Sequence, residues 1–170
     1  FAGLVIINRT SQIYFSPGSS LVLVDSGVAS TALINTAATR GFGGIEFLAG
    51  VPGTIGGAVA TNAGYQNQSI SSFVKDVTML VTDGQEHRIM TVPTTDLHFH
   101  IGGSLLETDA PYPPILLGIR LQLSSLYPEE VMRRLRALRR RAELVHRTLP
   151  QLGGLTKPLF EGHPSLIKEA

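Results

Sequence analysis

A glycine-rich stretch between residues 44 and 64 is the part of the sequence best suited to binding chemistry. Six of its 21 residues are glycine, and they lie among hydrophobic neighbours. The segment Val51–Thr54 predicts a turn, because proline pre-sets φ and the following glycine tolerates a positive φ. Gly56 and Gly57 then keep side chains away from the backbone, so N–H groups are able to approach an anion such as a nucleotide pyrophosphate. Close packing of two layers explains the same glycines equally well, and the stretch fits neither standard phosphate-binding template.

The same stretch carries a specific family resemblance. The segment Glu46–Ala58, read together with Asn62-Ala63-Gly64, resembles the signature of the UDP-N-acetylenolpyruvoylglucosamine reductase (MurB) family. The resemblance runs from about residue 3 to residue 167 and implies an FAD enzyme of peptidoglycan synthesis with a fold of the vanillyl-alcohol-oxidase type. It implies that the cofactor-binding positions are Gly53, Thr54, Gly56, Gly57 and Asn62. The family's first-domain FAD loop would lie upstream of Phe1, so we expect these positions to be vestigial. We expect no bound cofactor, or FAD if the site is intact.

Two motifs carry the catalytic groups that the resemblance implies, and both are altered in this sequence. A Tyr-Arg-x-Ser motif falls at Ile101–Ser104, where Gly102 stands in the place of the arginine. A second motif falls at Gly153–Lys157, where Gly154 stands in the place of a proton-donating serine. The family's late glutamate would lie beyond the last residue. Losing a cation and an acid should raise the reaction barrier by roughly several kcal/mol each. We therefore expect no catalytic residues in this chain.

The bulk composition is that of a folded domain. A length of 170 residues allows one domain, or one domain and a small appendage. Hydrophobic residues make up 43% and charged residues 16%, which indicates a core rather than disorder. The net charge of +1 argues against a wholly basic nucleic-acid binder, and the absence of cysteine excludes disulfides and thiolate metal sites. No apolar run approaches the length of a membrane span.

Periodicity and turn signals predict the order of elements. Strands are predicted at 4–7, 13–15, 21–28, 73–82, 88–92 and 115–123, and helices at 29–39 and from Pro128 to Pro150. Asp83-Gly84 predicts a two-residue hairpin turn between two of the strands. With the family resemblance, this order predicts an α+β fold, a truncated MurB-like FAD-binding domain with a mixed or antiparallel sheet and flanking helices. The flavin-type domain, without its N-terminal subdomain, is expected at 1–125. The helix and a remnant of the substrate domain are expected at 126–170.

The last helix is amphipathic and rich in arginine. One face carries a hydrophobic stripe, and the other carries seven of the 14 Lys+Arg residues. A solvated face is one explanation of this pattern, and a contact surface for a polyanion or an acidic protein is the other. Without these seven arginines the net charge of +1 would be −6, which favours the contact surface. The residues predicted to form it are Arg133, Arg136, Arg139, Arg140 and Arg147.

A histidine pair offers a possible metal site. His98 and His100 are predicted to share one face of a strand. No carboxylate or third ligand follows at a fitting spacing, so we expect structural histidines and no metal.

Two functional hypotheses follow from the sequence. In the first, the chain is a catalytically inactive relative that serves as a structural or interaction subunit of a larger assembly, such as the ribonucleoprotein of an organellar ribosome. It would use the arginine-rich helix and bind no small-molecule substrate and no membrane. In the second, the chain is a fragment or divergent form of an FAD- and NADPH-dependent reductase, completed by residues elsewhere. The sequence leaves open a mitochondrial or a cytoplasmic location.

Overall fold

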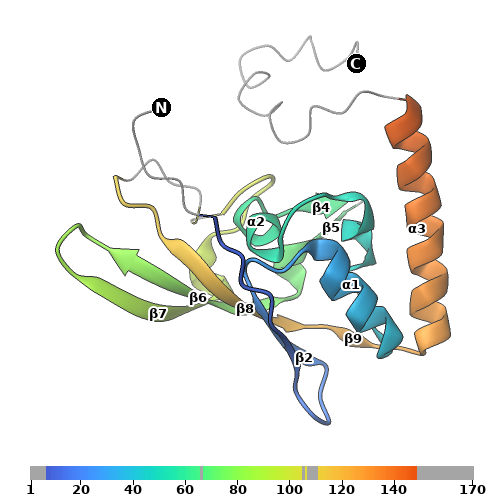
Figure 1. Cartoon of the computed structure of the whole chain (residues 1–170), viewed down its shortest axis with the longest axis horizontal. Coiled ribbons are helices and arrows are strands. Elements are labelled where there is room, and N and C mark those ends of the chain that lie inside the picture. The colour runs from blue at the N-terminus through green and yellow to red at the C-terminus, as the bar shows by residue number, and fades with distance from the viewer. Residues whose placement is uncertain (1–6, 66, 105, 107–110, 149–170) are drawn as a thin grey trace.

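A five-stranded antiparallel sheet forms the centre of the chain (Figure 1). The computed structural model describes residues 7–65, 67–104, 106 and 111–148, with side chains up to residue 140. Across the sheet the strands follow the order β1 (Ile13–Phe15), β2 (Leu21–Asp25), β8 (Ile115–Gln122), β6 (Val74–Thr82) and β7 (His87–Pro93). Every neighbouring pair is antiparallel, and β8 lies at the centre although it is the last of these five strands in the sequence.

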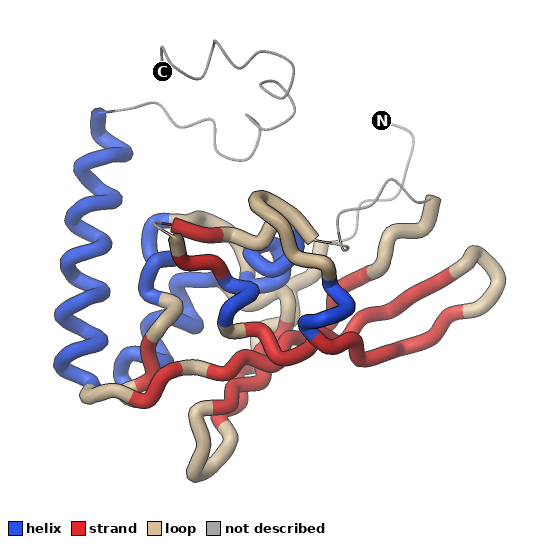
Figure 2. Tube along the Cα trace, turned by 180° about the vertical axis from the view of Figure 1, so that it is seen from behind, coloured by secondary structure: helices blue, strands red, loops and turns tan. Residues whose placement is uncertain are grey.

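Short helices cover one face of this sheet, and a long helix stands at its end (Figures 1 and 2). The covering elements are α1 (Ser30–Thr39), α2 (Ile55–Ala60) and the 3-10 helices η1 (Glu46–Gly50), η2 (Ile70–Ser72) and η3 (Thr94–Leu97). Two small sheets join them, one of β3 (Phe42–Gly43) with β9 (Ser124–Ser125) and one of β4 (Gly64–Tyr65) with β5 (Gln68–Ser69). The long helix α3 (Pro128–Thr148) packs on η1 and α1. No helix in the described ranges is long and apolar enough to cross a membrane.

Alternation along the strands builds the core. In β2, Val22 and Val24 are buried beneath the helices, while Leu23 between them is exposed on the other face. In β8, Ile119 and Leu121 are buried in the same way. Burying a side chain of this size completely contributes about 1.5–3 kcal/mol. The two strands therefore fix which face of the sheet receives α1 and α2.

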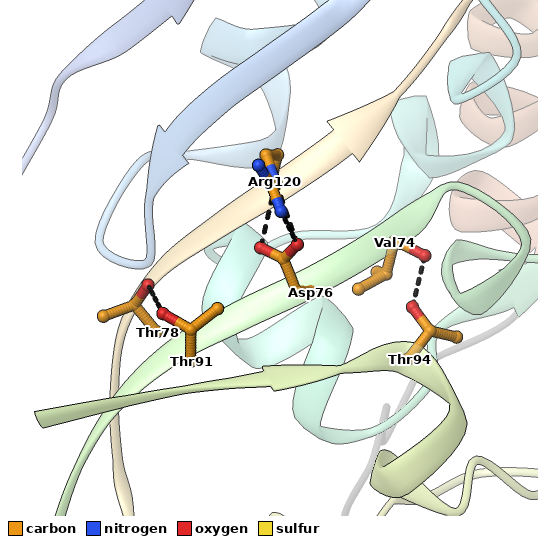
Figure 3. A network of polar contacts seen from close by, with 6 residues as sticks. All are labelled: Val74, Asp76, Thr78, Thr91, Thr94 and Arg120. Carbon is orange, nitrogen blue, oxygen red and sulfur yellow. Dashed lines mark hydrogen bonds and ion pairs between the residues drawn. The ribbon is translucent and has the colours of Figure 1, made fainter.

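Polar pairs tie the strands together on the uncovered face (Figure 3). The Arg120 Nε atom of β8 donates to both carboxylate oxygens of Asp76 in β6, at 3.1 and 2.9 Å. The hydroxyls of Thr78 in β6 and Thr91 in β7 lie 3.3 Å apart. The Asp76 carboxylate raises the pKa of the Arg120 guanidinium. The Arg120 side chain is 46% exposed, so the ion pair stabilises the sheet by only about 0.2–1 kcal/mol.

The predicted α+β fold, with an antiparallel sheet and flanking helices, is confirmed. The helix predicted at 29–39 begins one residue later, and the helix predicted from Pro128 begins there. The strands predicted from residue 13 onward are present with small shifts at their ends. Residues 4–6 of the first predicted strand and Pro150 lie outside the described residues.

The hairpin between β6 and β7 has a longer loop than predicted. Its last pair joins Thr82 to His87, so the loop contains four residues, from Asp83 to Glu86, and the prediction of a two-residue turn was wrong. The reason is a side-chain cap, because Asp83 Oδ1 accepts the N–H groups of Gln85 and Glu86, both at 2.9 Å. The hydrogen bond from the Glu86 N–H, and then the one from the Gln85 N–H, lower the pKa of the Asp83 carboxyl.

The histidine pair does not lie on a strand, so that prediction was also wrong. His98 follows η3 in the left-handed conformation, with φ at 45°, and this breaks the alternation that a strand requires. His100 belongs to a tight turn, where it forms an isolated bridge with Gly103. Across the described residues, no three histidine or acidic side chains gather as metal ligands would.

Candidate functional site

Helix α2 separates the predicted cofactor positions into two groups. Gly53, Thr54, Gly56 and Gly57 lie at or before its first turn, and Asn62 follows its last residue. A helix of this length is about 9 Å long. The two groups are therefore distinct places on the surface and are described separately.

Close packing accounts for Gly56. A Cβ atom added there would lie 2.7 Å from Ser26 Cβ and 2.8 Å from the Ser26 carbonyl oxygen. The Gly56 N–H donates to that same oxygen at 2.9 Å, which holds α2 against the end of β2. The neighbouring Gly57 meets only the Thr54 hydroxyl, at 3.6 Å, and faces outward. Of the two adjacent glycines, one is required by packing and the other is not.

The first turn of α2 offers no N–H group to an anion. The Ile55 N–H donates to the Val28 carbonyl at 2.8 Å, and the Gly57 N–H donates to the Thr54 hydroxyl at 3.2 Å. With the Gly56 N–H also taken, all three donors of this turn have acceptors inside the protein. Packing therefore accounts for Gly56, and at Gly57 the N–H is already bonded to Thr54, so neither glycine presents a free donor to an anion.

The adjoining start of α1 is better suited to a phosphate. Ala29 and Thr54 form a bridge, and the Ser30 N–H donates to the Gly53 carbonyl at 3.0 Å, so the N-termini of α1 and α2 lie side by side. Within the described residues, the N–H groups of Thr31, Gly53 and Thr54 have no acceptor. Ala29 provides no side-chain cap, which leaves the positive end of α1 exposed.

Two further observations fit an anionic group at this junction. The Ser30 hydroxyl is buried, at 1% exposure, and has no hydrogen-bond partner among the described residues. Gly53 has a φ of 126° and no atom within 4 Å of an added Cβ, so its backbone is open to approach. The sequence motifs did not predict Ser30 and Thr31 as candidate binding residues. The available signal was a helix start in which alanine stands where a capping residue is usual.

A second site lies at the other end of α2, around Asn62. Its amide Nδ2 donates to the His100 carbonyl at 2.8 Å, and its Oδ1 accepts the Ser71 N–H at 3.3 Å. Asn62 has a φ of 46°, a conformation that asparagine tolerates better than most residues. Both functional ends of its side chain therefore form hydrogen bonds, one to the turn at His100 and one to η2.

Gly102, at the position where the family resemblance predicts an arginine, lies in the turn that Asn62 contacts. The His100 N–H donates to the Gly103 carbonyl at 3.0 Å, and the Gly103 N–H donates back at 3.2 Å. Ile101 and Gly102 form the tip between them, with Ile101 fully exposed and Gly102 at a φ of 77°. A side chain at that φ costs about 1–2 kcal/mol. The backbone conformation of this turn therefore favours glycine over arginine at position 102.

Ser104, the last residue of the same motif, is structural. Its hydroxyl donates to the Ala60 carbonyl at 2.8 Å and accepts the Leu106 N–H at 3.3 Å. The side chain is only 2% exposed. It satisfies the last turn of α2 and has no remaining freedom to contact a ligand.

Asn62 and Gly102 line a common groove of about 580 Å³. None of its described lining residues carries a formal charge. They are Thr61, Asn62, Ala63, Gly64, Tyr65, Asn67, Gln68, Ser69, Ile101 and Gly102. The groove is able to hold a neutral polar group through amides and hydroxyls. None of the described lining residues is a cation that could stabilise a developing negative charge.

Some arginines of the predicted contact surface have partners within the described part of the chain, and others do not. Arg133 forms an ion pair with Glu130, and Arg139 donates to Asn35 Oδ1 of α1 at 2.6 Å. Arg136 and Arg140 are exposed and have no hydrogen bond or ion pair within the described part of the chain. Arg134 also donates to Glu130, at 2.8 Å, and this hydrogen bond is the main reason that the pKa of Glu130 is lowered. The Arg147 side chain and Gly154 lie outside the described residues.

Several known proteins with similar sequences are reductases. A UDP-N-acetylenolpyruvoylglucosamine reductase of Prochlorococcus marinus (strain NATL2A) is 36% identical over 130 residues, which are 76% of this chain and 43% of that protein. The reductase of Caulobacter vibrioides (strain NA1000 / CB15N) is 32% identical over 155 residues, or 90% of this chain and 50% of that protein. The resemblance that the motifs indicate is therefore confirmed, and the chain spans about half the length of these relatives or less.

The fold leads to the same group of proteins. The crystal structure of the UDP-N-acetylenolpyruvylglucosamine reductase (MurB) of Thermus caldophilus matches with a TM-score of 0.61 and 26% identity, over 76% of this chain and 44% of that one. Residues 1–90, more than half of the chain, match the family model described as FAD binding domain. These residues include the glycine-rich stretch and both helices, α1 and α2, whose N-termini lie side by side. The chain therefore belongs to the FAD binding domain family.

Proposed function

We propose that this chain is a relative of the MurB reductases that does not catalyse their reaction and serves as a structural and interaction subunit of a larger, ribonucleoprotein assembly. One observation carries the proposal. The position expected to hold the catalytic arginine is Gly102, at the tip of a tight turn whose φ favours glycine. A reductase would need a cation at this place to stabilise charge that develops during the reaction.

The surroundings of Gly102 support the same conclusion. The groove that it lines has no charged residue within the described ranges, so none of these described side chains supplies the expected cation. Removing a single preorganised donor from an active site commonly lowers kcat by about 10²–10³. The second expected group, the serine at position 154, is also glycine in the sequence. Losing a cation and an acid together accounts for an inactive domain.

A second candidate function is FAD binding within a divergent reductase, and the α1–α2 junction favours it. Ser30, Thr31, Gly53 and Thr54 would hold the pyrophosphate of FAD, because they combine free N–H donors with an unpartnered hydroxyl. Bound FAD would supply hydride transfer. Under this second candidate function the chain binds FAD, and residues outside the groove around Gly102 provide the cation and the acid.

The two functions are separated by one set of measurements on the purified chain. Quenching of flavin fluorescence during a titration measures FAD binding, and NADPH oxidation in the presence of the enolpyruvyl sugar nucleotide measures turnover. We expect no substrate-dependent oxidation at any FAD concentration. Substrate-dependent turnover by the chain alone would refute the proposal. FAD binding without turnover would show that the chain keeps its cofactor and is non-catalytic.

Ser30 provides a variant for the cofactor arm. Its hydroxyl is buried without a partner, so Ser30→Ala should leave thermal stability unchanged or slightly higher. If FAD binds at the junction through this hydroxyl, the same variant should bind FAD more weakly. Ser104→Ala is the control, because it removes a hydroxyl that is buried and bonded at the far end of α2.

A further inference from the structure

An open hollow of about 840 Å³ lies between the β1–β2 loop and the C-terminal end of α1. Its described lining residues are Phe15–Ser20, Arg40, Phe42, Gln122 and Ser125. Arg40 is the only one of them with a formal charge, and none is acidic. The volume falls within the range of about 300–1,000 Å³ that is usual for small-molecule sites. Helix α1 is about 15 Å long, so this hollow is separate from the α1–α2 junction at the other end of that helix.

Two aromatic rings hold the Arg40 guanidinium in place beside the hollow. Its Cζ atom lies 4.5 Å from the centroid of the Phe15 ring, which is the geometry of a cation–π contact. Phe15 in turn stacks on Phe42, with ring centroids 5.5 Å apart and planes 15° from parallel. Among the described residues no hydrogen bond or ion pair engages the Arg40 side chain, and neither Glu129 nor Glu130 pairs with it. The guanidinium N–H groups are therefore positioned without an acceptor in the described part of the chain.

The β1–β2 loop adds uncharged donors to the same hollow. Its turn is closed by the Ser19 N–H, which donates to the Ser16 carbonyl at 3.3 Å, and Gly18 supplies the positive φ of 69° that the turn requires. Within the described residues the N–H groups of Gly18 and Ser20 have no acceptor, and the Ser16 hydroxyl has no hydrogen bond. The Ser19 and Ser20 hydroxyls each accept one hydrogen bond and keep their own O–H for donation. The loop therefore offers several donors beside one cation.

We propose that this hollow binds a phosphate group, carried either by inorganic phosphate or by a monoester of a small organic molecule. An arginine without an acidic partner among the described lining residues selects an anion. The planar guanidinium group is able to donate two parallel hydrogen bonds to one phosphate. The hydroxyl and N–H donors of the loop exceed what the two oxygens of a carboxylate accept, whereas a phosphate group presents at least three acceptor oxygens. The inference goes beyond the proposed function and does not depend on it.

Titrations of the whole chain followed by ¹H–¹⁵N NMR test the inference, with inorganic phosphate, phenyl phosphate and acetate as probes at constant ionic strength. We expect saturable shifts at the N–H groups of Gly18 and Ser20 and at Arg40 Nε with both phosphates, and weaker binding of acetate. Tighter binding of phenyl phosphate would assign the site to a monoester, and equal binding would assign it to free phosphate. Acetate that binds as tightly as both phosphates, or the absence of saturable shifts at these three groups, would overturn the proposal.

Three variants separate the positioned arginine from a general charge effect. Arg40→Gln should bind phosphate about 10- to 100-fold more weakly, because it removes hydrogen bonds to a charged ligand. Phe15→Leu keeps the charge but removes the ring that holds it, and should weaken binding about 2- to 5-fold.

The matched control is Arg88→Gln, which removes the same charge from an exposed position on β7, at the other edge of the sheet. Salt screens a charge at that distance, so affinity should change by less than about twofold. Thermal melting checks that each variant is folded at the temperature of the titration. Equal losses in Arg40→Gln and Arg88→Gln would overturn the proposal and leave Arg40 with only its favourable place as a cation at the C-terminus of α1.

Discussion

Replacing Gly56 with alanine should destabilise the chain, whereas the same change at Gly57 should stabilise it. The Cβ of alanine at position 56 would lie within 2.8 Å of Ser26 Cβ and its carbonyl oxygen, so backbone must move. Overpacking of this kind costs about 1–3 kcal/mol. Alanine recovers up to about 1 kcal/mol through its higher helix propensity. Because a backbone atom takes part in the clash, we expect a net loss of about 1–2 kcal/mol.

Gly57→Ala is a matched control in the adjacent position of the same helix. Its Cβ would meet only the Thr54 hydroxyl, at 3.6 Å, which is an ordinary contact. The change should therefore stabilise the chain by about 0.5–1 kcal/mol, through helix propensity and a less flexible unfolded chain. The two variants have the same composition, so their difference isolates the packing of α2 on Ser26.

Urea denaturation followed by circular dichroism measures the free energies of unfolding, and thermal melting gives a second readout. For a chain of this size, 1 kcal/mol corresponds to about 2–4 °C in Tm. We expect Gly56→Ala to melt about 2–8 °C lower than the parent and Gly57→Ala about 1–4 °C higher. Equal stability of the two variants would refute the packing explanation. It would return both glycines to the group of candidate ligand-binding positions.

Three further predictions concern the turn, the asparagine and the helix N-terminus. Gly102→Ala should lower the free energy of unfolding by about 1–2 kcal/mol, because of its positive φ, and an unchanged urea midpoint would contradict the turn geometry. Asn62→Ala should lower the free energy of unfolding by about 1–3 kcal/mol in the same assay, since it removes two hydrogen bonds that join this segment to the turn at His100 and to η2. Glu130→Gln removes a carboxyl whose pKa is lowered from its usual 4.5, chiefly by the hydrogen bond from Arg134. The ionised pair stabilises the folded chain above that value, and this contribution is lost as the pH falls through the lower folded pKa. The Tm of the parent should therefore be higher than that of the variant near neutral pH, and the two Tm values should become equal in acid. A difference in Tm that does not change with pH would contradict the ion pair.

Local patterns were sufficient to predict most of the elements. The alternation in β2 and β8 and the proline with two acidic residues at the start of α3 are signals within single segments, and the structure contains these elements. The Gly44–Gly64 stretch was enough to indicate the family. Each of these signals depends only on residues close together in the chain.

The features that sequence did not predict depend on distant contacts. Gly56 and Gly57 differ only because Ser26 lies against one of them, and their spacing cannot reveal this. The segment after η3 was predicted as a strand, but a hydrogen bond from Asn62 fixes the His100 carbonyl in a turn instead. Similarly, the hydrogen bond of Arg139 to α1 follows from how two helices pack.

The most direct test of the account is the rate of NADPH oxidation by the purified chain, with FAD and the enolpyruvyl sugar nucleotide both supplied in excess. Gly102 stands in place of the expected cation, and none of the described residues that line its groove is charged. The account therefore predicts a rate equal to that of free FAD without protein. A rate that increases with the concentration of the chain, and that requires the sugar nucleotide, would contradict it.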